Sequence, residues 1–113
     1  MALQDLMNYP GENSWYDQLW YDTVESNLDS LVTISNVNAQ AVPPIAHEHF
    51  KHNFYGYLRE NVTEDRKYWY VIMRANNMFS PKEFDEKNDY VIWPNLNSID
   101  SLHDTYLASL RTN

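Results

Sequence analysis

The chain has 113 residues, no cysteine and a formal net charge of -8. This length predicts a single domain, and the lack of cysteine excludes disulfides and thiolate ligands for a metal. The negative charge argues against general binding to nucleic acid or to anionic membranes, because phosphate groups need clustered Lys and Arg.

The first predicted element is an aromatic N-terminal arm, residues 1–28. After the turn signal Pro10-Gly11, a short helix over residues 14–21 carries apolar side chains around much of its circumference and must bury them. Aromatic residues, 15% of the chain, suit protein interfaces because they join a large apolar area to a polar tip. We expect the arm to dock on a neighbouring chain, the alternative being a helix folded back on its own core. The interface candidates in the arm are Trp15, Tyr16, Leu19, Trp20 and Tyr21.

A strand and a helix are predicted next. Residues 31–37 are β-prone, and apolar side chains alternate over the first half of this stretch. The polar residues 36–40 are expected to bend or end the strand. Pro44 fits the first position of a helix, where its missing N–H costs nothing, and this helix is predicted to run from about Ile45 to Glu60.

The central predicted element is a buried helix over residues 63–77. Four of its apolar residues share one face at helical spacing, namely Tyr68, Val71, Ile72 and Ala75. Thr63 is expected to cap the start, and Asn76-Asn77 to form the exit, because Asn tolerates the left-handed conformation that ends helices. The link to the preceding helix is short, which predicts a helical hairpin.

A helical turn, a second strand and a terminal helix complete the prediction. Ser80 before Pro81 opens the turn, and residues 90–93 are typical of a strand closed by Pro94. The tail, residues 98–113, carries apolar side chains at helical intervals and is predicted to be a helix that packs on the core or reaches for a partner. Its interface candidates are Tyr106 and Leu110.

The order strand, helix, helix, strand predicts an α+β fold. The two strands are expected to pair antiparallel, with both helices on one face of the ribbon. The chain then divides into the arm 1–28, a core domain 29–97 and the helical tail 98–113.

The same order of elements is that of the LysM fold, and the central segment resembles the LysM-type baseplate wedge proteins of contractile-tailed bacteriophages. The resemblance rests on residues 68–77, which are similar to the family's aromatic-rich helix ending in Asn. It continues with Phe79-Ser80-Pro81 and with the strand at residues 90–94. Upstream, residues 43–46 and Tyr55-Gly56 resemble the two ends of the family's first helix. The likeness covers about residues 31–96, and the turn at 86–89 lacks the family's glycine.

The resemblance implies a structural protein of the virion that binds other baseplate and tail proteins in a multi-copy assembly. It implies no catalysis, and no cofactor, nucleic-acid or membrane partner is expected. No apolar run approaches the length that spans a bilayer, and residues 1–6 lack the features of a secretory signal, so assembly in the host cytoplasm is expected. The second hypothesis is a glycan-binding module, because LysM domains in general bind N-acetylglucosamine polymers. A third is an inhibitor whose acidic surface mimics nucleic acid.

One stretch of histidines is a candidate for metal binding, residues 47–52. A zinc-protease helix needs His-Glu-x-x-His, but Lys51 stands where the second histidine belongs. His49 and His52 could share a helical face, yet a closed zinc site needs about four ligands and His103 is far away in sequence. A solvated helix face is the preferred interpretation. Acidic pairs at 64–65 and 85–86 are interpreted as caps, so no catalytic, cofactor-binding or metal-binding residue is predicted.

Overall fold

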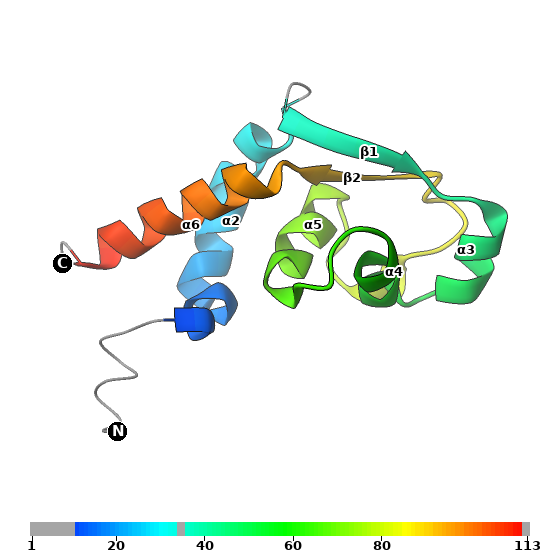
Figure 1. Ribbon diagram of the computed structural model, residues 1–113, viewed down its shortest axis with the longest axis horizontal. Coiled ribbons are helices and arrows are strands. Elements are labelled where there is room, and N and C mark those ends of the chain that lie inside the picture. Colours follow the sequence, from blue (N-terminus) through cyan, green and yellow to red (C-terminus); the bar gives the residue numbers. More distant parts are fainter. Residues whose placement is uncertain (1–10, 34–35, 112–113) are drawn as a thin grey trace.

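The computed structural model describes residues 11–33 and 36–111. These residues form a small α+β fold in which a two-stranded antiparallel sheet lies against helices (Figure 1), as predicted. The elements in chain order are η1 (Gly11–Tyr16, a 3-10 helix), α2 (Gln18–Leu31), β1 (Val37–Ala41), α3 (Pro44–Phe50), α4 (Phe54–Asn61), the 3-10 turn η3 (Arg66–Tyr68), α5 (Trp69–Ala75), the 3-10 turn η4 (Pro81–Glu83), β2 (Tyr90–Pro94) and α6 (Leu96–Arg111).

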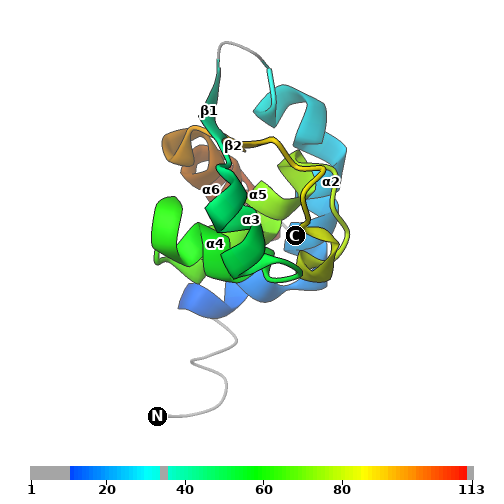
Figure 2. The same cartoon turned by 90° about the vertical axis from the view of Figure 1, so that its right-hand side faces the viewer.

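The two strands pair residue for residue, from Val37 opposite Pro94 to Ala41 opposite Tyr90. Helices α4 and α5 lie on the same side of this ribbon, as Figures 1 and 2 show from two directions. One polar side chain ties α5 to the outer edge of β2. The Asn76 amide donates to the carbonyl oxygen of Ile92 at 2.7 Å, and its Oδ1 accepts from the N–H of the same residue at 2.8 Å.

The hydrophobic core lies where α2, α4, α5, β2 and α6 converge. Burial of these apolar side chains supplies the main driving force for folding. The fully buried members are Trp20, Val24, Phe54, Tyr57, Leu58, Val71, Ile72, Phe84, Val91 and Ile99. Trp20 and Val24 of α2 and Ile99 of α6 belong to this core, so its side chains come from all three predicted segments, 1–28, 29–97 and 98–113.

The described part of the predicted N-terminal arm folds back on the chain's own core. Val24 and Leu31 are buried, and Leu28 packs against the core. These three residues are spaced by four and then three positions, so they lie on one face of α2, which is turned toward the core. This face extends the helix to Leu31, well beyond the short helix predicted over residues 14–21. Residues 1–10 of the predicted arm lie outside the described residues.

The first strand lies further along the chain than predicted. The expected strand over 31–37 is wrong except for Val37, because α2 takes Leu31 and the turn after it takes Val32. Residues 34–35 fall outside the described part of the chain. β1 instead runs through residues that were expected to bend or end the strand, and there it pairs with β2 along its whole length.

The helix predicted from Ile45 to Glu60 is divided into α3 and α4. His52 adopts a φ of 62°, a left-handed conformation that a continuous helix cannot contain. A new helix then starts, because the Asn53 side chain accepts a hydrogen bond from the N–H of Gly56 at 3.1 Å. Three helices therefore separate the described strands, where two were predicted.

The central helix is shorter than predicted, because a 3-10 turn capped by Asp65 precedes it and α5 begins at Trp69. Its predicted exit is confirmed, since Asn77 adopts a φ of 64°. The helical turn after Ser80, the strand ending at Pro94 and the terminal helix are confirmed as well.

Candidate functional site

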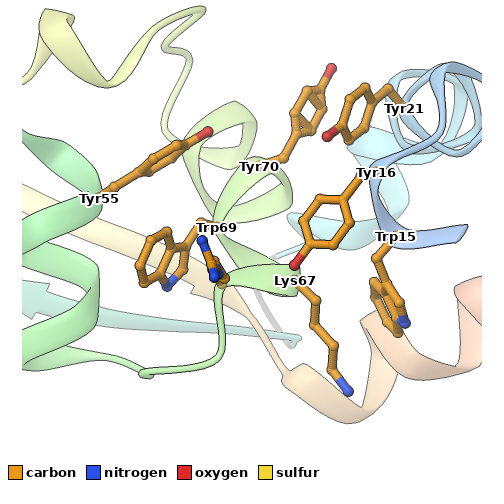
Figure 3. Close-up of a pocket in the computed structure, with 8 residues that line it drawn as sticks. Trp15, Tyr16, Tyr21, Tyr55, Lys67, Trp69 and Tyr70 are labelled. Atoms are coloured by element: carbon orange, nitrogen blue, oxygen red, sulfur yellow. The ribbon is translucent and has the colours of Figure 1, made fainter. Parts of the chain in front are cut away.

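A pocket of about 230 Å³ opens between the N-terminal helices and the start of α5 (Figure 3). Its walls come from η1, α2, α4, η3 and α5, so it exists only in the folded chain. The lining residues are Trp15, Tyr16, Tyr21, Tyr55, Arg66, Lys67, Trp69 and Tyr70. Six of these eight residues are aromatic, and the other two carry positive charge.

The N-terminal wall is fixed by contacts with α6. The Trp15 ring stacks on His103 with 3.7 Å between ring centroids, and Ser14 Oγ lies 2.9 Å from His103 Nε2. Burial lowers the pKa of His103, and the charged groups that also act on it are Asp104, Lys67 and Asp100. A neutral imidazole therefore joins η1 to α6 through its contacts with Trp15 and Ser14.

The opposite walls are held by aromatic contacts and hydrogen bonds. Tyr21 and Tyr70 stack with ring centroids 4.0 Å apart, and the hydroxyl of Tyr70 donates to Glu25 at 3.2 Å. Burial and the Glu25 carboxylate raise the pKa of Tyr70 to about 12, so this hydroxyl stays neutral. Trp69 lies against Tyr55, and its indole N–H donates to the carbonyl of Thr63 at 3.1 Å. The walls are thus largely preformed.

Two cations stand among these rings. Lys67 Nζ lies 5.0 Å from the centroid of the Trp15 ring and 3.5 Å from an Asp65 carboxylate oxygen. Arg66 is exposed, and it forms no ion pair with another residue in the described ranges. Lys67 is already paired with Asp65, so Arg66 is the lining cation left for the carboxylate of a ligand, and the surrounding rings suit an apolar or aromatic group beside that carboxylate.

The predicted interface residues fall into different environments. Trp20 is fully buried in the core, which corrects the prediction that it contacts a partner. Tyr106 is also buried, although it lines a hollow of about 340 Å³ between α2 and α6 together with Leu19 and Leu110. Leu19 and Leu110 are exposed, and for them the interface stays a prediction.

In the arm, Trp15 is 8% exposed and Tyr16 is 47% exposed, and both line the aromatic pocket with Tyr21. The other lining residues were not predicted as site residues from the sequence, namely Tyr55, Arg66, Lys67, Trp69 and Tyr70. A usable signal was the basic pair placed directly before the aromatic run that starts at Tyr68. The contribution of Tyr55 could not be found, because it depends on the packing of α4 beside α5.

The histidines of residues 47–52 do not converge. The break after α3 separates His49 from His52, so the shared helical face does not exist. His47 Nε2 lies 2.8 Å from the carbonyl oxygen of Asn88, and His52 Nδ1 lies 2.9 Å from that of Lys82. Within residues 11–33 and 36–111, no three His, Asp or Glu side chains gather in a metal-binding arrangement.

The chain thus has a small α+β fold with an aromatic pocket, whose lining includes the two basic residues Arg66 and Lys67. No helix in the described part of the chain is long and apolar enough to cross a membrane. Comparisons of the chain with protein-family models, with curated proteins and with solved structures give no match.

Proposed function

We propose that this chain is a non-catalytic structural protein of a phage tail baseplate, which binds a neighbouring subunit through the aromatic pocket during virion assembly. The pocket is the observation that carries the binding role. The resemblance of residues 68–77 and 90–94 to baseplate wedge proteins supplies the setting.

The pocket has the properties of a protein-binding anchor point. Tyr and Trp dominate the energy of protein interfaces because each buries a large area at a low cost in side-chain entropy. Here Tyr21 is already stacked on Tyr70, and the Trp69 indole already has its hydrogen-bond acceptor. A partner side chain therefore enters without ordering the walls first, which removes much of the usual cost of binding.

Charge decides which side chains enter. Arg66 supplies an exposed positive charge beside the rings, so the proposed partner presents an aromatic or aliphatic side chain next to Asp or Glu. The carboxylate pairs with the exposed guanidinium of Arg66, and the apolar group fills the space between the rings.

The test is complementation of a phage from which this coding sequence has been deleted. Contractile tails are counted by electron microscopy after expression of the wild-type chain, of Arg66→Glu or of Arg59→Glu. Arg59 is an exposed residue of α4 outside the pocket lining, and it provides the matched charge reversal. We expect wild type and Arg59→Glu to restore tails, and Arg66→Glu to reduce their number at least tenfold.

Two outcomes contradict the proposal. Normal tails without any copy of this chain would remove the baseplate role. Equal complementation by the Arg66 and Arg59 variants would remove the pocket from that role, and mass spectrometry of purified tails would then show whether the chain is still present in the particle.

A second candidate function is glycan binding, and the aromatic walls of the same pocket favour it. Sugar rings present apolar C–H faces that lie against Tyr and Trp rings, and an oligosaccharide needs a concave aromatic site of this kind. Titration with chitin oligomers, followed by tryptophan fluorescence, separates the two candidates. Saturable binding that is lost in Tyr16→Ala favours the glycan, whereas an unchanged spectrum at every concentration excludes it.

A further inference from the structure

The outer edge of β2 is covered, and the outer edge of β1 is open. Both the N–H and the carbonyl of Ile92 bond to the side chain of Asn76, so these groups point away from β1. Ala39 stands opposite Ile92 in the antiparallel register. This pair is therefore not hydrogen-bonded, and the N–H and carbonyl of Ala39 also point away from the sheet.

The same alternation runs along the whole of β1. Val42 donates to Asp89 and Asn36 accepts from Asn95, so the even-numbered residues face β2. The odd-numbered ones, Val37, Ala39 and Ala41, direct their backbone groups outward. Within the described residues, no backbone or side-chain group bonds to the outward N–H and carbonyl of Ala39. Figure 1 shows β2 between β1 and α5, with no described segment along the far side of β1.

Nothing in the local sequence protects this edge. Natural proteins guard open strands with charged residues, proline or a bulge, because an unguarded edge pairs with other strands. Residues 30–47 contain no Asp, Glu, Lys or Arg, although such residues make up 21% of the chain. β1 itself has no proline and pairs without a bulge. An edge left open in this way fits a strand that is covered in the working assembly.

We propose that β1 is a docking edge, on which an extended segment of another protein adds as a third, antiparallel or parallel strand. Outward backbone groups at Val37, Ala39 and Ala41 provide the hydrogen bonds, as in other cases of strand addition. The central residues of the incoming segment are uncharged, because β1 offers no partner for a charge. This surface is separate from the aromatic pocket, so the inference does not rest on the proposed function.

Charge selects a different protein over a second copy of this chain as the occupant. Two copies would bring net charges of -8 together, which opposes self-association through a neutral strand. Asp89 lies beside the end of β1, where its carbonyl accepts from Val42, and it is exposed. An incoming strand flanked by Lys or Arg therefore matches both the neutral centre and the acidic surroundings.

The experiment is amide hydrogen exchange by NMR on the full chain, with a synthetic peptide of alternating Thr and Val between terminal Lys residues as the probe. In the free chain, we expect the amides of Ala39 and Ala41 to exchange at least about tenfold faster than those of Asn38 and Gln40. Saturating peptide should slow Ala39 and Ala41 at least about tenfold and leave Asn38 and Gln40 unchanged.

A variant isolates the backbone contribution. Ala39→Pro removes only an N–H that points to solvent, a position where edge strands accept proline, and it should abolish peptide binding. Ala39→Val keeps the N–H and is the matched control, which should bind like wild type. Slow exchange of Ala39 in the free chain, no peptide binding, or binding without protection of Ala39 would each overturn the proposal. Protection that grows with protein concentration alone would overturn the choice of occupant, since a second copy would then cover the edge.

Discussion

The ion pair between Glu25 of α2 and Arg74 of α5 gives the sharpest test of the packing. Arg74 is largely buried, and its Nε and Nη2 donate to the two Glu25 carboxylate oxygens at 2.7 and 3.0 Å. Its Nη1 donates to the carbonyl of Met78 at 3.1 Å, and the guanidinium lies 4.0 Å from the centre of the Phe79 ring. Glu25→Gln keeps the size of the side chain but removes its charge and one acceptor.

The cost follows from the unequal burial of the two partners. The Arg74 side chain is 9% exposed and that of Glu25 is 39% exposed. Hydrogen bonds to charged groups contribute about 1.5–3 kcal/mol, and partial exposure of the carboxylate places this pair in the lower half of that range. We therefore expect Glu25→Gln to lower the free energy of unfolding by about 2 kcal/mol. For a domain of this length, the midpoint of thermal unfolding should fall by about 8 °C.

The effect depends on pH in a defined direction. Hydrogen bonding from Arg74 holds the pKa of Glu25 below its ordinary value of 4.5. The unfolded chain therefore binds the proton first as the pH falls. The stabilisation is complete above about pH 4.5, and it disappears as the pH drops through the lower pKa of the folded state.

Urea unfolding followed by tryptophan fluorescence measures this difference at pH 7 and again near pH 3. Glu60→Gln is the matched control, because Glu60 and Arg59 form a pair at 3.7 Å with both side chains more than half exposed. That variant should change stability by less than about 0.5 kcal/mol. An equal loss in both variants, or a Glu25→Gln difference that stays constant down to pH 3, would refute the assignment.

Two further substitutions test contacts that link distant segments. Asn76→Ala removes both bonds to Ile92 and should destabilise the fold by about 2–3 kcal/mol, measured by urea unfolding, whereas a loss below about 0.5 kcal/mol would exclude the role of this amide. His103→Gln should flatten the fall in stability as the pH drops below 6.5, because burial lowers the pKa of His103 and the unfolded chain therefore takes up the proton first. His49→Gln, at an exposed position of α3, should leave that fall unchanged, and a flattened profile in this control would contradict the assignment to His103.

The sequence correctly predicted those elements whose ends are marked by proline or by a capping side chain. Pro44, the Ser80-Pro81 turn and the Asn76-Asn77 exit all have side chains that act on their own backbone, so local chemistry fixes them. The strand closed by Pro94 follows the same rule. These features need no knowledge of the rest of the chain.

Elements that depend on distant partners could not be placed in this way. In β1, Val37, Ala39 and Ala41 alternate with two polar residues, but this signal is weak because alanine is small, and the pairing with β2 sets where the strand begins and ends. The left-handed conformation of His52 could not be predicted from the sequence, because the apolar residues on both sides of it keep a helical spacing. Asn53 was the available signal for a new helix, since its side chain caps α4.

The candidate site was half predictable for the same reason. The sequence pattern singled out the aromatic residues at 15–21 as candidates for an interface. It could not show that Trp15 stacks on His103 of α6, because the two residues are far apart in the sequence. Sequence spacing cannot show which of two adjacent aromatic residues points inward. Here Trp15 is buried and Tyr16 is exposed, although both line the pocket.

The contact between η1 and α6 joins residues 89 positions apart, through Ser14 and His103. Trp20 of α2 also packs against His103 and Tyr106, so during synthesis on the ribosome its indole lacks these two neighbouring rings until α6 has emerged. A truncated product that ends before α6 would expose this indole and the aromatic residues around it, which makes it a ready substrate for chaperones and proteases.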